Sequence, residues 1–130
     1  MADRPAPRED ANVARRVLLV DDHARFRQTA RRALERDGWT IAGEAADGAA
    51  GIARAHAIEP DVVVLDVGLP DMSGLEVARR LRRALPHVAV VIVSTQDSTD
   101  FRDLAVANGA LAFIPKAELN GATLGALLPG

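Results

Sequence analysis

Residues 62–74 read VVVLDVGLPDMSG, a run of branched apolar side chains that ends on Asp66. Four consecutive apolar residues are typical of a parallel strand that is covered on both faces. A carboxylate directly after such a strand is a candidate functional group. Gly68 and Gly74 permit a tight loop whose backbone can closely approach a ligand, and Pro70 stiffens that loop.

Short apolar runs like this one alternate with longer stretches in which apolar residues recur three and four positions apart. The short runs are 17–20, 39–45, 62–65, 88–93 and 111–114. The predicted helical faces are Phe26, Ala30, Ala33 and Leu34; Ala49, Ile52, Ala53 and Ala57; Leu75, Ala78, Leu81 and Leu85; Phe101, Leu104 and Ala105; and a fifth helix over about 117–127. Strict alternation of five strands and five helices predicts an α/β fold with an open, doubly wound parallel sheet.

Length and composition limit what the chain can be. Its 130 residues are enough for one domain, and the polar, aperiodic residues 1–14 predict a disordered N-terminal tail. There is no cysteine, no apolar signal segment and no apolar run long enough to span a membrane. We therefore expect a cytoplasmic protein without membrane contact. A net charge of −2 gives no basic excess of the kind that marks nucleic-acid binders, so this chain is not expected to bind DNA.

Polar side chains follow four of the five predicted strands, at the edge where doubly wound sheets gather their functional groups. They are Asp21 and Asp22 after the first strand, Asp66 after the third, Ser94 and Thr95 after the fourth, and Lys116 after the fifth. The histidines, including His23, show no metal-site spacing, and we expect them to be surface or capping residues.

Three carboxylates at one edge repel one another, at roughly 4 kcal/mol for each pair about 4 Å apart at an effective dielectric near 20. Mg²⁺ is the expected partner, because it prefers oxygen ligands and binds through one or two carboxylates together with a phosphate. Lys116, the only lysine in the chain, supplies a second compact positive charge. A carboxylate beside a metal, an ammonium and a hydroxyl is the arrangement of a phosphoryl acceptor, with Asp66 as the nucleophile.

The sequence resembles the receiver domains of two-component response regulators over residues 16–128. The segments that carry the resemblance are VLLVDDH (17–23), DVVVLDVGLPDMSGLEVARRLR (61–82), VVIVST (90–95) and NGALAFIPKAEL (108–119). The resemblance implies a flavodoxin-like fold, with the receiver domain over 15–130. It is closest to receivers that precede helix-turn-helix output domains. The chain is then either a single-domain regulator or an excised receiver.

The resemblance also implies a role for each site residue. Asp66 accepts a phosphoryl group from a sensor histidine kinase or a phosphotransfer protein, and Lys116 and Ser94 assist. Mg²⁺ is ligated directly by Asp22 and Asp66, by Asp21 mainly through water, and by the backbone carbonyl of Gly68. Ser94 and Phe113 are the switch residues: the hydroxyl moves toward the phosphoryl group and the aromatic ring rotates inward. This remodels the face of the fourth helix, fifth strand and fifth helix for an unknown downstream protein, or for a phosphorylation-dependent homodimer.

Two alternatives stay open. A magnesium-dependent aspartyl-phosphate hydrolase of the haloacid-dehalogenase type would have a second aspartate two residues after the nucleophile, where this chain has Gly68. A receiver that docks to its partner without phosphorylation would not need the complete set of acids, hydroxyl and lysine. We therefore expect a phosphoacceptor that catalyses only its own phosphorylation and dephosphorylation, and not an enzyme acting on an external substrate.

Overall fold

The structure is a computed structural model and describes residues 15–96 and 99–128; the predicted tail over residues 1–14 lies outside these residues. A five-stranded parallel sheet has the strand order β2-β1-β3-β4-β5. The strands are β1 Arg16–Val20, β2 Thr40–Ala45, β3 Val62–Asp66, β4 Ala89–Ser94 and β5 Ala112–Pro115. The helices are α2 Ala24–Arg36, α3 Gly48–Ile58, α4 Gly74–Ala84, α5 Thr99–Ala107 and α6 Gly121–Gly125, with a 3₁₀ turn η1 at Lys116–Glu118.

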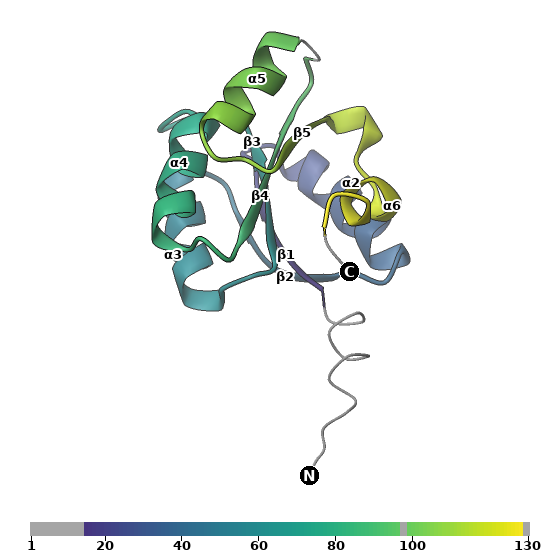
Figure 1. Ribbon diagram of the computed structural model, residues 1–130. Helices are drawn as coiled ribbons and strands as arrows, with labels where there is room; N and C mark the ends of the chain where they lie inside the picture. Colours follow the sequence, from purple (N-terminus) through teal and green to yellow (C-terminus); the bar gives the residue numbers. More distant parts are fainter. Residues whose placement is uncertain (1–14, 97–98, 129–130) are drawn as a thin grey trace.

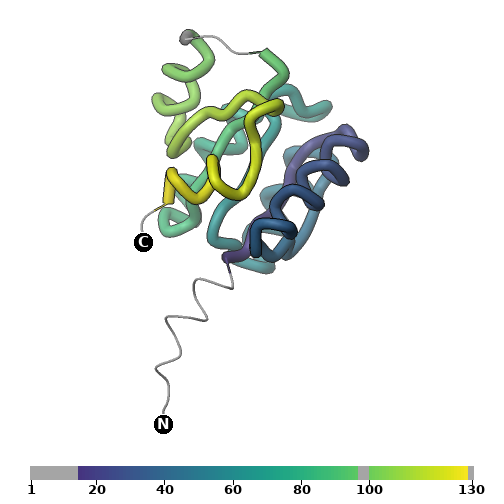
Figure 2. The backbone as a smooth tube through the Cα atoms, turned by 90° about the vertical axis from the view of Figure 1, so that its right-hand side faces the viewer, coloured from purple at the N-terminus to yellow at the C-terminus, as the bar shows by residue number. Residues whose placement is uncertain are grey.

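Helices cover both faces of the sheet, as the sequence predicts for a doubly wound α/β fold. In Figure 1, α3, α4 and α5 lie on one face, and α2 and α6 lie on the other. Figure 2 turns this second face toward the viewer, and α2 and α6 are in contact there. Each strand boundary lies within one residue of its predicted position.

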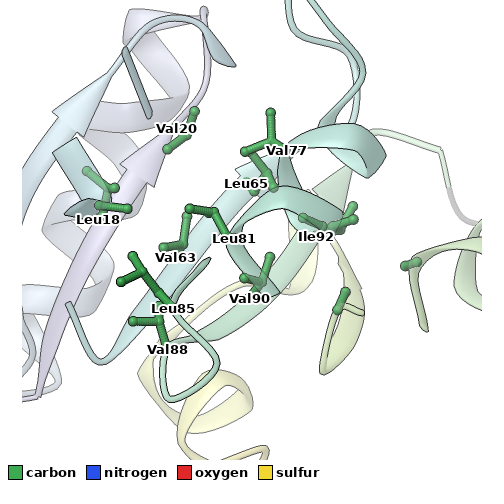
Figure 3. Close-up of a cluster of buried hydrophobic side chains, with 14 of the residues drawn as sticks. Leu18, Val20, Val63, Leu65, Val77, Leu81, Leu85, Val88, Val90 and Ile92 are labelled. Carbon is green, nitrogen blue, oxygen red and sulfur yellow. The ribbon is translucent and has the colours of Figure 1, made fainter. Parts of the chain in front are cut away.

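Two apolar cores result, because alternate side chains of each buried strand point to opposite faces of the sheet. From β1 and β3, Leu18, Val20, Val63 and Leu65 join the core under α3, α4 and α5 (Figure 3). Their neighbours Val17, Leu19, Val62 and Val64 join the core under α2 and α6. Burial on both faces explains why these strands are apolar throughout instead of alternating.

The predicted faces of the first and third helices are confirmed, and two others need correction. In α3 the face Ala49, Ile52, Ala53 and Ala57 is wrong: the buried positions are Gly48, Gly51 and Ala55, and only Ile52 of the predicted set packs against the core. A Cβ at Gly51 would lie 2.8 Å from Val20 Cγ1, so glycine allows the helix to approach β1 closely. Periodicity failed here because most residues of α3 are alanine or glycine. In α5, Leu104 is also wrong, being 47% exposed, whereas Ala105 is buried.

The predicted fifth helix over 117–127 is not continuous. The chain makes the turn η1, becomes extended at Leu119 and then begins the short helix α6. Asn120 caps α6: its side chain accepts from the Thr123 N–H, and the Thr123 hydroxyl accepts from the Asn120 N–H. Leu119, at the extended residue before this cap, is buried in the core beside α2. The cap and this buried side chain together restart the helix.

The loop after β3 is fastened to α3 by Asp71. The two carboxylate oxygens accept from the backbone N–H groups of Gly48 at 2.7 Å and Ala49 at 2.9 Å. These two hydrogen bonds lower the pKa of Asp71 below 3.8. The N–H groups belong to the first turn of α3, where they have no partner within the helix.

We expect Asp71→Asn to lower the melting temperature at pH 7 by a few degrees, because one carboxylate oxygen and the charge are lost. A lowered pKa means that this stability is present above pH 3.8 and is lost as the pH falls through the folded-state pKa. Thermal unfolding from pH 7 to pH 2 should therefore show the two proteins converging in acid. Asp103→Asn, at an exposed position of α5, is the control; a pH-independent difference at Asp71 would contradict the argument.

Candidate functional site

The carboxyl ends of β1, β3 and β5 bring Asp21, Asp66 and Lys116 together. The Lys116 Nζ lies 2.7 Å from Asp21 Oδ2 and 3.4 Å from Asp66 Oδ1. The ammonium also lies 4.5 Å from the centre of the Phe26 ring, on the first turn of α2. The predicted neutralising role of Lys116 therefore has a geometric basis: one cation lies between two buried carboxylates.

Asp66 carries its charge in an unfavourable place. Its side chain is buried, and this desolvation raises the pKa above 3.8. The neighbouring carboxylates of Asp21 and Asp22 raise it further, while Lys116 acts in the opposite direction. Lys116 alone does not offset the burial and the two neighbouring carboxylates, so an added positive charge would stabilise the ionised form of Asp66.

His23 belongs to the site, although we expected it to be a surface or capping residue. It precedes α2 at the capping position and is largely exposed, as predicted, but its Nδ1 lies 3.1 Å from Asp21 Oδ1 and 3.3 Å from Asp22 Oδ1. Asp21, Asp22, His23 and Asp66 each offer one ligand atom, and these four atoms lie within 4.8 Å of one another. The available signal was the place of His23 directly after the acidic pair.

Ser94 lies at the end of β4 with its side chain buried, and its Oγ accepts from the Gln96 N–H at 3.0 Å. It faces the same pocket as Asp66 and Lys116. The pocket is lined by His23, Asp66, Val67, Gly68, Ser94, Thr95, Gln96, Phe101 and Lys116. The structure thus brings the predicted acceptor, hydroxyl and lysine into one cavity.

Phe113 lies in the core behind this pocket. It is buried in β5, its ring stacks on Phe101 with centroids 6.2 Å apart, and the Arg102 guanidinium lies 5.3 Å from the ring centre. Phe101, from α5, is the aromatic residue that reaches the pocket lining. Phe113 therefore already occupies an inward position, connected to the pocket through Phe101.

The two glycines of the loop after Asp66 have different roles. A Cβ at Gly74 would lie 2.2 Å from the Asp66 carbonyl oxygen and 2.8 Å from the Val67 Cα, so this position must be glycine. A Cβ at Gly68 would meet only the Asp66 Oδ2, at 3.9 Å, which is an ordinary contact. We expected both glycines to let the loop backbone approach a ligand; at Gly74 the close approach is instead to the backbone of Asp66 and Val67, whereas Gly68 is open toward the pocket.

The donor set suits a hard divalent cation. It consists mainly of carboxylate oxygens, the ligands that Mg²⁺ prefers. Asp21 Oδ2 is buried and, among the described residues, makes no hydrogen bond of good geometry, although it lies beside the Lys116 ammonium. Asp21 Oδ2 thus faces the ammonium, and the fit to a metal ion rests on the cluster itself, in which Asp21, Asp22 and Asp66 can each place one carboxylate oxygen.

Comparison with known proteins identifies the family. The family model of the response regulator receiver domain matches residues 17–126. The chain belongs to this family. The response regulator GacA of Pseudomonas viridiflava is 36% identical over 102 residues, which cover 78% of this chain and 48% of that protein. The crystal structure of a LuxR-family two-component response regulator from Aurantimonas sp. SI85-9A1 has a TM-score of 0.79 at 32% identity, covering 86% of this chain and 84% of that one.

This receiver domain matches proteins with different outputs. A protein-glutamate methylesterase/protein-glutamine glutaminase of Anaeromyxobacter dehalogenans is 42% identical over 116 residues, which cover 88% of this chain but 33% of that protein. The chain spans between a third and a half of the length of the curated relatives it matches. The flavodoxin-like fold and the assignment to two-component signalling are confirmed. Within the described part of the chain, no helix is long and apolar enough to cross a membrane.

Proposed function

We propose that this receiver accepts a phosphoryl group on Asp66 and changes its partner-binding surface in response. The observation that carries the proposal is the position of Lys116, whose ammonium lies between the buried carboxylates of Asp21 and Asp66 in a pocket shared with Ser94. An ordinary surface salt bridge leaves its charged groups exposed to water. A cation held between buried carboxylates is instead suited to a site that receives further negative charge. We take residues 15–130 as the receiver domain and residues 1–14 as a tail outside it.

The pocket contains the nucleophile and the side chains that would assist the transfer. An Asp66 carboxylate oxygen forms a bond to phosphorus as the P–N bond of a phosphohistidine breaks, and the electron pair leaves with the imidazole. With acetyl phosphate the P–O bond breaks and acetate leaves. Lys116 offsets the charge that reaches the pocket, and the Ser94 hydroxyl, whose oxygen accepts from the Gln96 N–H, can donate its own hydrogen to a phosphoryl oxygen.

Asp22 and Asp66 would hold Mg²⁺ directly, with Asp21 acting through water and Gly68 offering its carbonyl. Gly68 is exposed and open toward Asp66 Oδ2, which is compatible with this role. When bound, Mg²⁺ neutralises negative charge on the carboxylates and on the transferring oxygens. His23 adds a nitrogen donor at the mouth of the same cluster.

The partners follow from this chemistry. The phosphoryl donor is the phosphohistidine of a sensor kinase or of a phosphotransfer protein. The responsive surface comprises α5, β5 and α6, because Ser94 contacts the loop before α5 and Phe113 stacks on Phe101 of α5. A downstream protein or a second copy of the chain would recognise this surface. Movement of Ser94 toward a phosphoryl group would release the Gln96 N–H in the loop after β4.

The test is the intact mass of the wild-type protein after incubation with acetyl phosphate, with and without Mg²⁺. We expect one added phosphoryl group per chain, and only with Mg²⁺. An unmodified mass under both conditions, together with no binding of beryllofluoride, would contradict the proposal. A phosphorylated histidine kinase domain as the donor extends the test to the expected physiological chemistry.

The same samples separate the two alternatives. A hydrolase would release phosphate from a small phosphomonoester over many turnovers, whereas we expect no more than one phosphoryl group per chain from acetyl phosphate. A receiver that docks without phosphorylation would bind its partner equally well as the wild type and as Asp66→Asn. Position 68 is glycine, so the chain does not have the second aspartate that a hydrolase of the haloacid-dehalogenase type places two residues after its nucleophile.

A further inference from the structure

Arg27, on the second turn of α2, connects the acidic pair to the edge strand of the sheet. One guanidinium nitrogen donates to the backbone carbonyl of Asp21, and Nε donates to Glu44 Oε1 at 2.8 Å. The side chain is mostly buried. Arg27 therefore connects the loop that carries Asp21 and Asp22 to β2, because a terminal nitrogen of its guanidinium contacts the loop while Nε contacts Glu44.

Glu44, which accepts from Arg27, is itself held in place by a second arginine. Arg31, one turn further along α2, donates to Glu44 Oε2 through Nε at 3.0 Å and a terminal nitrogen at 2.7 Å. Burial raises the pKa of Glu44, but the hydrogen bonds from Arg31 and Arg27 outweigh it and leave the pKa below 4.5. Glu44 is thus ionised near neutral pH and is held by two arginines.

The backbone of Asp21 is restrained at both its N–H and its carbonyl group. Its N–H donates to the Ala45 carbonyl of β2 at 3.0 Å, and its carbonyl accepts from Arg27. Beyond it, the Asp21 carboxylate accepts from the His23 N–H at 2.8 Å. These hydrogen bonds fix the backbone at Asp21 and so set the directions in which the Asp21 and Asp22 side chains leave it.

We propose that Arg27 is the positioning residue of the acidic pair: by holding the Asp21 carbonyl against β2, it fixes the Asp21 and Asp22 carboxylates in the geometry that binds Mg²⁺. This inference rests on the proposed function, because it concerns the same metal site. Partners that orient metal ligands commonly change metal affinity by 10- to 100-fold when they are removed. A lysine would not replace Arg27, because its single ammonium lacks the planar fork that reaches both acceptors.

Arg31 provides a matched control on the same helix. Both arginines pair with Glu44, and both lose one positive charge when changed to glutamine. Only Arg27 contacts the loop of the acidic pair. The variants Arg27→Gln, Arg27→Lys and Arg31→Gln therefore separate the loss of charge from the loss of loop positioning.

The experiment is a Mg²⁺ titration of each full-length variant, followed by the backbone amide signals of Asp22, His23 and Gly68 in NMR spectra, with the melting temperature recorded alongside. We expect the Mg²⁺ dissociation constant to rise about tenfold in both Arg27 variants and to stay within about twofold in Arg31→Gln. Phosphorylation by acetyl phosphate should slow in the Arg27 variants at low Mg²⁺ and recover at saturating Mg²⁺.

Equal affinities in the Arg27 and Arg31 variants would overturn the inference while leaving the proposed function intact. A wild-type protein whose amide signals do not respond to Mg²⁺ would instead overturn the proposed function, and this inference with it. If Arg27→Gln does not fold, Arg27→Lys, which keeps the charge, decides the matter. Failure of both to fold while Arg31→Gln folds would show that Arg27 serves the fold and not the site.

Discussion

Asp66→Asn is expected to abolish phosphorylation and, in the absence of Mg²⁺, to make the protein more stable at neutral pH. The first effect follows because asparagine has no nucleophilic carboxylate oxygen in the position that faces Lys116 and the pocket. Incubation with acetyl phosphate and Mg²⁺ should add one phosphoryl group to the wild type and none to the variant. Added mass on the variant would place the acceptor at another residue.

The gain in stability comes from removing a buried charge near two others. The pKa of Asp66 is raised by burial and by Asp21 and Asp22, so the folded protein binds this proton more tightly than the unfolded chain does. Stability therefore falls as the pH rises from 3.8 through the folded-state pKa, and stays lower above it. Lys116 keeps its partner Asp21 in the variant. We therefore expect the free energy of unfolding at pH 7 to be higher for the variant than for the wild type.

Urea unfolding in the presence of a chelator, at pH 7 and at pH 3, measures this gain. The variant should be more stable at pH 7, and the difference should largely vanish at pH 3, where the wild-type carboxyl is protonated. Addition of Mg²⁺ at pH 7 should stabilise the wild type more than the variant, since a ligand stabilises the state that binds it. A variant that is less stable than the wild type at pH 7 would contradict the argument that the buried Asp66 carboxylate destabilises the folded protein.

Gly74→Ala is expected to cause the largest loss of stability. The new Cβ would lie 2.2 Å from the Asp66 carbonyl oxygen and 2.8 Å from the Val67 Cα, and both are backbone atoms at the end of a buried strand. The Gly74 N–H also donates to the Val67 carbonyl at 2.8 Å, so α4 cannot move away without losing this hydrogen bond. Overpacking typically costs about 1–3 kcal/mol, and we expect Gly74→Ala to lie at the upper end because the new Cβ meets backbone atoms.

Gly68→Ala is the matched control in the same loop. Its Cβ would meet only the Asp66 Oδ2 at 3.9 Å, and we expect a change of less than about 0.5 kcal/mol, as for most surface substitutions. Urea unfolding of the two variants and the wild type checks both values. A Gly74→Ala protein as stable as Gly68→Ala would show that the loop can open at no cost, and that the close approach of α4 to Asp66 is not required.

The sequence by itself determined the order of the elements and the chemistry of the site. Apolar runs such as 62–65 predicted strands buried on both faces, and the positions of Asp21, Asp66, Ser94 and Lys116 after their strands predicted that they would meet. These inferences held because the carboxyl ends of parallel strands converge at one edge whatever the details of packing. Local hydrogen-bonding signals are equally readable: Asp47 and Ser73 belong to the residue types that favour helix N-caps, and they cap α3 and α4.

Only the tertiary structure decided which contacts these residues make. The buried face of α3 depends on how closely Gly48 and Gly51 approach their neighbours, and a helix of small side chains has no hydrophobic pattern that reveals this. The break before α6 depends on Leu119 entering the core beside α2. The approach of His23 to the acids, and the span of Arg27 from Asp21 to Glu44, join residues through geometry that periodicity does not encode. Sequence patterns indicate which residues are buried. The direction of a polar side chain depends instead on the hydrogen-bonding partners that tertiary packing places near it.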